Sequence, residues 1–242
     1  MDTIKVKSGK TRMIAHRGLS GLETENTCAA FVAAGNRSYW SIETDIHRTA
    51  DGNFIIHHDP DTSRVGGKKL VIEETDFAVL QEFRLRDKDG SYTRADLRLP
   101  SLEEYIGICK RYEKTSVLEL KSAFTEEEIK EIIDRIEKMS WLPHVIFIAF
   151  DYENLVKVRK VKPEQPCQFL TEWFSEDLLT RLIKDDIDLD IYYPALTEKD
   201  VKLCHENGVL VNVWTVDKKA DAERLIDWGV DFITSNILEG QA

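Results

Sequence analysis

Short runs of β-branched and aromatic residues alternate with amphipathic segments along almost the whole chain. A short apolar run bounded by turn residues is typical of a buried strand, whereas a longer segment with apolar residues three and four positions apart is typical of a helix. Their alternation predicts a parallel sheet with crossover helices. The predicted strands are 13–16, 40–46, 54–57, 116–120, 144–150, 167–170, 189–192, 210–214 and 231–234, and the predicted helices are 26–34, 101–112, 125–138, 152–161, 176–184, 198–206 and 218–228.

Capping signals mark several of the predicted helix ends. Ser101 lies three residues before Glu104, and Thr125 lies three residues before Glu128. At this spacing each side chain accepts a hydrogen bond from the other residue's backbone N–H at a helix start. Gly229 follows a predicted helix and precedes a strand, where a left-handed cap residue is expected.

Nine predicted strands are one more than a (β/α)₈ barrel needs. The strands at 40–46 and 54–57 flank a turn at Asp51-Gly52, so the second is expected to extend from the barrel rim without a helix of its own. A doubly wound sheet fits the alternation nearly as well, but it usually has a glycine-rich phosphate loop after its first strand, which this sequence lacks. We therefore predict an α/β fold, a TIM (β/α)₈ barrel in which residues 1–242 form one domain.

The stretch 61–98 interrupts this rhythm. It is polar, contains Gly66-Gly67 and Asp89-Gly90, and has only one helical pattern, at 76–83. We predict that it is a small insertion after the second strand, lying over one end of the barrel. The chain of 242 residues is long enough for one barrel to bury a substantial core.

The balance of charge restricts the possible partners. The chain has 33 Lys and Arg against 44 Asp and Glu, a net charge of -11, so its surface should repel nucleic acid and anionic membranes. A small anionic substrate is still compatible, because a bound cation and a few local Lys or Arg can reverse the potential inside one pocket. The sequence leaves the oligomeric state open.

Targeting and membrane signals are not evident in the sequence. Residues 1–7 lack the apolar stretch of a secretory signal, and the longest strongly apolar run, 145–150, is too short to cross a bilayer. The four cysteines are far apart and lie in apolar segments, which favours buried, reduced thiols. We predict a cytoplasmic protein without stable membrane insertion.

Three acidic residues lie at the ends of predicted strands. Glu43 and Asp45 are two residues apart, so both carboxylates point to one side of their strand, and Glu119 ends the next major strand with Lys121 on its own side. In a barrel this side is the mouth, where three like charges repel one another unless a cation lies between them. Oxygen ligands favour Mg²⁺, Ca²⁺ or Mn²⁺ over zinc. For any one of these acids alone, a salt bridge or a solvated strand end is the alternative.

Two histidines follow predicted strands in the same way. His16-Arg17-Gly18 ends the first strand, where Arg17 offers a planar fork of donors suited to phosphate oxygens. His58 follows the strand 54–57, and His57 faces the opposite side of that strand. Hydrolysis of a phosphodiester requires one group to remove a proton and another to supply one, and two histidines can do both. For either histidine alone, a structural hydrogen bond is the alternative.

Several of these runs occur together in a fixed order. They are Ile14-Ala15-His16-Arg17-Gly18, Glu25-Asn26-Thr27, the run 43–52, His58-Asp59, the run 99–104, the run 118–121 and Val213-Trp214-Thr215-Val216. Together they cover about residues 12–236 and resemble the glycerophosphodiester phosphodiesterase family. One departure is Thr24, which occupies the place where the family usually has proline, and it makes any role of Glu25 less certain.

The resemblance implies a function and a set of roles. It implies hydrolysis of a small-molecule glycerophosphodiester to sn-glycerol 3-phosphate and an alcohol, with one divalent cation, Mg²⁺ or Ca²⁺ or else Mn²⁺. Trp214 either stacks against the substrate or fills the barrel. The helix start near Asn26 could donate backbone N–H groups to a phosphate oxygen, but we predict that Asn26 caps this helix. The implied roles are an acid/base pair of His16 and His58, metal ligation by Glu43, Asp45 and Glu119, and phosphate binding by Arg17 and Lys121.

Two other functions use the same fold. The first is a related barrel phosphodiesterase acting on lysophospholipids, a lysophospholipase D-like activity, which would differ in the leaving group. The insertion at 61–98 is where such specificity is expected, and its charged composition favours a small polar substrate. The second is a non-catalytic binding barrel, which is disfavoured because every residue that the chemistry needs is present.

Overall fold

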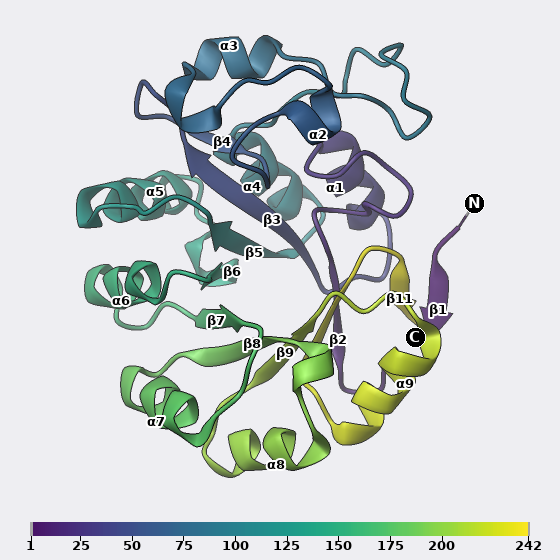
Figure 1. Cartoon of the computed structure of the whole chain (residues 1–242), viewed down its shortest axis with the longest axis vertical. Helices are drawn as coiled ribbons and strands as arrows, with labels where there is room; N and C mark the ends of the chain where they lie inside the picture. The colour runs from purple at the N-terminus through teal and green to yellow at the C-terminus, as the bar shows by residue number, and fades with distance from the viewer. Residues whose placement is uncertain (1, 242) are drawn as a thin grey trace.

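The computed structural model describes residues 2–241 and confirms the predicted barrel, with strands gathered at the centre and helices outside them (Figure 1). Its barrel strands are β2 (Arg12–Ala15), β3 (Ser41–Arg48), β5 (Thr115–Leu120), β6 (Val145–Ala149), β7 (Cys167–Thr171), β8 (Asp188–Tyr192), β9 (Val211–Trp214) and β10 (Phe232–Ser235). Each pairs in parallel with the next in this order, and β10 closes the barrel on β2. The nine predicted strands therefore reduce to eight barrel strands and one extra strand.

Helices cover the outside of the barrel, and each of them buries apolar residues against the strands. The capping boxes predicted at Ser101 and Thr125 are both present, with Glu104 N and Glu128 N donating to the two hydroxyls at 3.1 and 3.2 Å. None of the helices within residues 2–241 is both long enough and apolar enough to cross a membrane. The outer helices are α1 (Cys28–Gly35), α4 (Leu102–Arg111), α5 (Glu126–Lys138), α6 (Tyr152–Val161), α7 (Glu176–Asp185), α8 (Glu198–Glu206) and α9 (Lys219–Trp228).

Side chains alternate between the helix layer and the barrel interior along every strand. On β8, for example, Leu189 and Ile191 belong to the core between strands and helices, and Asp190 points inward. The lower interior is filled by a small apolar cluster that includes Ile14, Val117 and Phe232. This cluster fills the interior beneath the pocket, and the pocket lies where the carboxyl ends of the strands meet.

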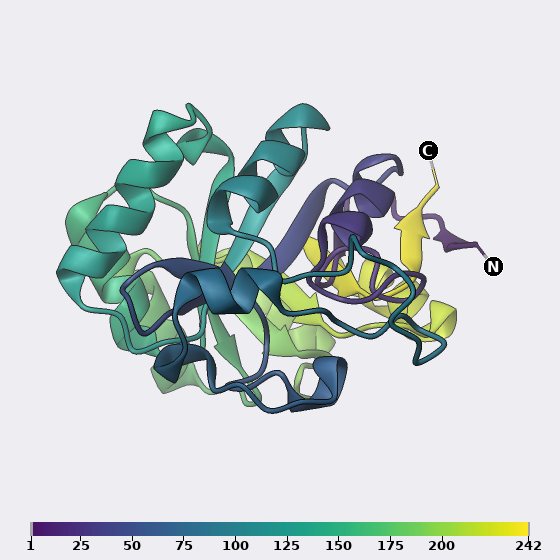
Figure 2. The same ribbon diagram turned by 90° about the horizontal axis from the view of Figure 1, so that it is seen from above.

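The extra strand and the insertion lie beside the barrel. Strand β4 (Phe54–Ile56) pairs antiparallel with the end of β3, as the turn at 51–52 predicted. The insertion contains α2 (Ser63–Gly66), the 3₁₀ turn η1 (Ile72–Glu74) and α3 (Phe77–Glu82), where the sequence indicated one helix only. Figures 1 and 2 show these elements on one side of the barrel, beyond β4. They have their own apolar cluster, which includes Ile72, Leu80 and Leu97.

The two ends of the described chain pair with each other, which the sequence analysis did not predict. Strand β1 (Ile4–Val6) runs parallel to β11 (Leu238–Gly240), and both ends lie side by side at one edge (Figures 1 and 2). The buried carboxylate of Glu239 accepts hydrogen bonds from Thr3 Oγ1 at 2.6 Å and from Ser38 N and Oγ at 2.6 and 2.7 Å, and it pairs with Lys5 Nζ at 2.7 Å. In the described residues no helix follows β10, and this small sheet takes that place.

The prediction that Asn26 caps α1 is wrong. The cap is Thr27, whose hydroxyl accepts from Ala30 N at 3.2 Å. Asn26 has a left-handed backbone with φ of 53°, which asparagine tolerates better than most residues. Its Nδ2 donates to Asp45 Oδ2 at 2.7 Å, and its Oδ1 accepts from the Thr44 hydroxyl at 2.7 Å. The amide is therefore directed at the end of β3 and not at a helix end.

Removal of the Glu239 charge should destabilise the fold in a pH-dependent way. Burial raises the pKa of this carboxyl, but Lys5, Thr3 and Ser38 outweigh burial and lower it to about 2. The carboxylate therefore contributes its full stability above about pH 4.5 and loses it as the pH falls toward 2. Glu239→Gln should lower the free energy of unfolding by about 2 kcal/mol at pH 7 in urea denaturation, and by less at pH 3.

The control for this measurement is Glu164→Gln, since Glu164 is exposed and forms no ion pair within residues 2–241. It should leave unfolding unchanged at both pH values. A Glu239→Gln deficit that stayed constant from pH 7 to pH 3 would show that the ionised carboxylate is not the stabilising group.

Candidate active site

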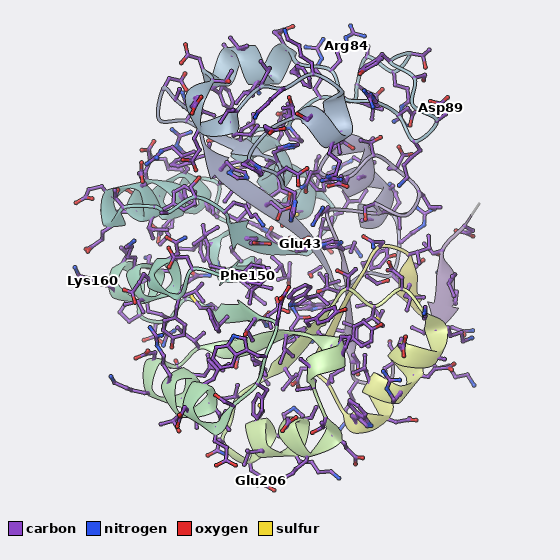
Figure 3. The ribbon with its side chains drawn as sticks, in the orientation of Figure 1. Glu43, Arg84, Asp89, Phe150, Lys160 and Glu206 are labelled. Carbon is purple, nitrogen blue, oxygen red and sulfur yellow. The ribbon has the colours of Figure 1, made fainter. Side chains whose placement is uncertain are left out.

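The carboxyl ends of the barrel strands surround a pocket of about 470 Å³. Figure 3 shows Glu43 and Phe150 near the middle of the barrel, whereas Asp89, Lys160 and Glu206 lie at the periphery. The charged side chains come from β2, β3, β5 and the end of β4, except for Asp190 on β8, and the apolar ones come mainly from β6 to β9. The lining residues are His16, Arg17, Glu43, His58, Glu119, Ile148, Phe150, Leu170, Asp190, Trp214, Thr215 and Thr234.

The three predicted acids meet beside this pocket, which Glu43 and Glu119 line directly. Asp45 and Glu119 are register partners on β3 and β5, and Glu43 lies two residues before Asp45 on the same face. One oxygen of each residue lies within 4.8 Å of the other two. All three side chains are buried, and Asp45 Oδ1 has no hydrogen-bond partner in the described part of the chain. This set of buried hard oxygen ligands fits a divalent cation.

Burial and mutual repulsion determine the pKa values of these acids. Burial, together with the carboxylates of Asp45 and Glu119, raises the pKa of Glu43 well above its usual range. Burial and Asp45 raise the pKa of Glu119 to about 8. Burial also opposes ionisation of Asp45, but the charges of Arg17, His58 and Lys121 and the hydrogen bond from Asn26 together outweigh burial, so the pKa of Asp45 is lowered. A bound divalent cation would remove the repulsion and let all three ionise together.

Two cationic residues, Arg17 and Lys121, neighbour the acids. The backbone N–H of Arg17 donates to Glu43 Oε2 at 2.8 Å, and its Nε lies 3.6 Å from Asp45 Oδ2. Lys121 Nζ donates to Glu119 Oε1 at 2.8 Å and lies 3.7 Å from Asp45 Oδ1. The side chains of Arg17 and Lys121 therefore both lie next to the carboxylates, and Arg17 also lines the pocket.

His16 is oriented by an amide that follows the last barrel strand. Its Nδ1 lies 2.7 Å from Asn236 Oδ1, and Asn236 in turn donates from Nδ2 and from its backbone N–H to Asp217 at 2.6 and 2.8 Å. Because Oδ1 can only accept, Nδ1 of His16 carries the proton and Nε2 keeps its lone pair. Burial and the charge of Arg17 lower the pKa of His16 to about 4, so the ring is neutral at neutral pH.

His58 is oriented by a chain of charges that passes through the insertion. Its Nδ1 lies 2.7 Å from Asp59 Oδ1, and Asp59 Oδ2 accepts from Arg64 Nε at 2.6 Å. The Arg64 guanidinium donates to both oxygens of Glu25 at 2.7 Å, and Glu25 Oε1 also accepts from Arg17 Nη1 at 2.8 Å. Helix α2, which contains Arg64, therefore connects His58 with Arg17 within the charged half of the pocket.

Glu25, whose role the sequence left uncertain, is a permanent anion between these arginines. Burial raises its pKa, but hydrogen bonds from Arg64 and Arg17 outweigh burial and lower the pKa to about 2. Thr24, in the place usually taken by proline, donates through its hydroxyl to Arg86 O of the insertion at 2.9 Å. The departure at Thr24 therefore adds a contact that holds this loop to the insertion.

The two remaining residues, His57 and Trp214, differ in whether they line the pocket. His57 does not line the pocket; it is buried, with Nε2 3.1 Å from Asp61 O. Trp214 lines the pocket, and its ring lies 5.6 Å from the Phe150 ring and 5.5 Å from the Tyr192 ring, centroid to centroid. It is thus both a packing residue and a surface that a ligand can touch.

Sequence reasoning missed three residues at this site. Asn236 directly follows β10, so the rule that active sites lie beyond the carboxyl ends of barrel strands could have found it. Asp190 is an acid within the apolar strand 189–192, which was also a visible signal. Arg64 carried no signal, because it reaches the site only through the fold of the insertion.

These residues together can stabilise negative charge and move protons at one point. Two histidines, a cluster of carboxylates suited to a cation and an arginine face the same pocket at the carboxyl ends of a (β/α)₈ barrel. This combination serves hydrolysis of phosphate esters with proton transfer by side chains. The fold and the site thus define a barrel enzyme of the phosphodiesterase class.

Comparison with known proteins agrees with this class. Residues 16–239 match the model of the glycerophosphoryl diester phosphodiesterase family, and the chain belongs to that family. It is 29% identical to the glycerophosphodiester phosphodiesterase of Bacillus subtilis (92% of this chain, 82% of the relative) and 28% identical to that of Caldanaerobacter subterraneus subsp. tengcongensis (94% of each). A solved Oleispira antarctica phosphodiesterase in complex with the product sn-glycerol-3-phosphate superposes with a TM-score of 0.80 at 26% identity, over 93% of each chain.

Divalent cations should stabilise the folded protein, because only the folded chain brings the three acids together. At a concentration about 100 times the dissociation constant, Mg²⁺, Ca²⁺ or Mn²⁺ should add about 2.7 kcal/mol and raise the Tm by roughly 5–10 °C over the EDTA-treated protein. Glu119→Gln should remove most of this shift. Asp188→Asn, which changes a partly buried acid elsewhere on β8, should retain it. Equal melting curves with EDTA and with each cation would rule out the metal site.

Proposed function

We propose that this chain hydrolyses glycerophosphodiesters to sn-glycerol 3-phosphate and an alcohol, with the help of one divalent cation and two histidines. The observation that carries the proposal is the convergence of His16 and His58 with a cluster of three carboxylates at one pocket. The names of the relatives support the substrate class, and the Oleispira antarctica enzyme was solved with sn-glycerol 3-phosphate as its product. A phosphodiester carries one negative charge, which suits a pocket with cations beside its acids.

The phosphate is proposed to bind at the charged side of the pocket. Glu43, Asp45 and Glu119 would hold Mg²⁺, Ca²⁺ or Mn²⁺, all of which accept oxygen ligands. When bound, the cation supplies positive charge that polarises the phosphoryl group. Arg17 and Lys121 are already beside these carboxylates, and we propose that they contact the phosphate oxygens.

The two histidines are proposed to move the protons. Each ring is held through Nδ1, by Asn236 in one case and by Asp59 in the other, which leaves each Nε2 for the substrate. One histidine takes the proton of the attacking group, and the other protonates the departing alcohol oxygen. Because both rings line one pocket, a substrate phosphate can lie between them.

The attacking group is proposed to be the substrate's own 2-hydroxyl. Within residues 2–241, neither histidine ring hydrogen-bonds to a serine, threonine or cysteine side chain that could serve as a nucleophile. The glycerol 2-hydroxyl lies next to the phosphate and has the high effective molarity of an intramolecular reaction. Its attack releases the alcohol and forms a cyclic 1,2-phosphate. Water then opens this ring, and the two histidines exchange their acid and base roles in that step. The alternative to this route is direct attack of water on the phosphodiester.

A second candidate substrate class is favoured by an aromatic rim, which we define as Phe150, Trp173 and Tyr192. These side chains are 47%, 56% and 42% exposed and follow or end β6, β7 and β8, across the barrel mouth from β3. Exposed aromatic rings bind apolar groups and quaternary ammonium groups well. Lysophospholipids with a choline or acyl portion are therefore the second candidate, and their specificity would depend on this rim as well as on the insertion.

The reaction is proposed to take place in the cytoplasm. All four cysteines are free, and three of them are buried in the core. Free thiols suit a reducing compartment.

A product assay tests the proposed function. Glycerophosphocholine, glycerophosphoethanolamine and glycerophosphoglycerol should each release sn-glycerol 3-phosphate, and excess EDTA should abolish release until a divalent cation is restored. Trp173→Ala should weaken turnover of lysophosphatidylcholine more than that of glycerophosphoglycerol if the rim binds the leaving group. Full turnover in EDTA contradicts the metal role, and no sn-glycerol 3-phosphate from any substrate contradicts the function.

Loss of either pocket histidine should slow the reaction without unfolding the protein. His16→Ala and His58→Ala should each lower kcat by roughly 10²- to 10⁴-fold, the usual effect of removing a positioned proton-transfer group. His57→Ala is the matched control, because His57 adjoins His58 in sequence but lies outside the pocket lining. An essential His57 with a dispensable His58 would mean that the assignment is wrong by one residue.

The 2-hydroxyl mechanism predicts a requirement in the substrate. A glycerophosphodiester and its 2-deoxy analogue differ only in the proposed nucleophile, so the analogue should bind as an inhibitor and should not be cleaved. Steady-state rates and inhibition constants measure both effects. If the analogue is hydrolysed as fast as its parent, water is the nucleophile instead.

A further inference from the structure

Asp190 is a buried acid at the pocket that has no part in the proposed chemistry. It lies on β8 between Leu189 and Ile191, which pack outward, and its own side chain points into the barrel. The side chain lines the pocket, and the residue is only 2% exposed. In the barrel order, β8 lies opposite β3, so Asp190 faces Glu43 and Asp45 across the interior.

The structure gives this carboxyl no partner. Asp190 Oδ1 is buried and has no hydrogen bond within residues 2–241. Asn212 is the register partner of Asp190 on β9, yet its Nδ2 donates to Gln168 Oε1 on β7 at 3.0 Å, and its Oδ1 accepts from the Thr234 hydroxyl at 3.2 Å. The polar side chains on the two flanking strands, Asn212 and Gln168, therefore bond to each other, and neither bonds to Asp190.

A buried carboxyl without a hydrogen-bond partner destabilises the folded protein unless a ligand bonds to it. Burial and the charge of Glu119 raise the pKa of Asp190 well above its usual range, which favours the neutral acid. A neutral carboxyl donates one hydrogen bond and accepts others, as a hydroxyl does. Buried polar groups in native proteins are nearly always bonded, so an exception that lines a pocket points to a ligand.

A second unpartnered group lines the same pocket. Trp214 Nε1 is a buried donor without an acceptor in the described chain, and Trp214 is the register partner of Tyr192, two residues beyond Asp190 on β8. The indole N–H can only donate. Asp190 and Trp214 lie on neighbouring strands and line one pocket, so a hydroxyl group bound between them would accept from the indole N–H and bond to the carboxyl.

We propose that Asp190 is a specificity-determining residue that binds the terminal hydroxyl of the substrate's glycerol group, with Trp214 Nε1 as the second partner. The proposal rests on the proposed function, which assigns the phosphate and the 2-hydroxyl to the side of the histidines and the carboxylates. The terminal hydroxyl is the polar group of glycerol that remains. The leaving alcohol points toward the open mouth and the aromatic rim, since Asp190 is buried and the rim is exposed.

The test uses a substrate that lacks only this hydroxyl. The 1-deoxy analogue of glycerophosphocholine keeps the phosphate, the choline and the 2-hydroxyl. The wild-type enzyme should prefer the parent by roughly 100-fold or more in kcat/KM, since a site built to bond a hydroxyl strongly rejects an analogue without it. In Asp190→Leu this preference should fall below about tenfold, mainly because the parent is turned over less well. The Tm of this variant should rise by a few degrees, because the unpartnered buried acid is removed.

Asp190→Asn and Asp188→Asn complete the experiment. The amide can still bond a hydroxyl, so Asp190→Asn should keep an intermediate preference, and it decides the question if the leucine variant does not fold. Asp188 lies on the same strand, but it accepts from Leu210 N at 2.8 Å and is outside the pocket lining, so Asp188→Asn should leave the preference unchanged.

The outcomes separate this inference from the proposed function. If the wild-type enzyme releases no sn-glycerol 3-phosphate from the parent, both fall. If it hydrolyses the parent and its 1-deoxy analogue equally well, or if the Asp190 variants keep the full preference, the proposed function stands and the role of Asp190 is refuted.

Discussion

The repulsion among three buried carboxylates is the constraint on which the rest of this site depends. Glu43, Asp45 and Glu119 converge because β3 and β5 are adjacent and in register, and burial makes their shared ionisation costly. The chain around them compensates with the Arg17 backbone N–H on Glu43 and the Lys121 ammonium on Glu119. A divalent cation bound among the three carboxylates would neutralise the negative charge that the Arg17 N–H and the Lys121 ammonium leave.

The pocket has two chemically different halves. The half from β2 to β5 holds the histidines and the acids, and the insertion supports it through Arg64, which bonds Asp59 and Glu25 together. The half from β6 to β9 is apolar and aromatic, with Asp190 as its one acid among the described lining residues. Such a division suits a substrate with a charged centre and two unlike substituents. The insertion therefore orients two pocket side chains, His58 and Arg17, in addition to covering one side of the barrel.

Several features could not be read from the sequence because they depend on partners far away along the chain. Asn26 resembled a helix cap, and only the fold shows that its amide bonds Asp45 at the end of β3. The β1 and β11 strands are three residues long and pair only when the barrel brings the chain ends together. Arg64 lies in a polar segment without periodicity, and its role depends on where α2 lies against the loop that contains Glu25.

The sequence by itself determined the eight barrel strands, the seven outer helices, the capping boxes at Ser101 and Thr125 and the side of each strand that carries Glu43, Asp45 and Glu119. These properties are local, since strand alternation, helical periodicity and capping depend on residues a few positions apart. Only the tertiary structure decided which acids share one cradle, which partners orient His16 and His58, and that Asp190 is left without a bond. These outcomes depend on barrel closure and strand register, because closure alone fixes which side chains from distant strands meet inside one small space.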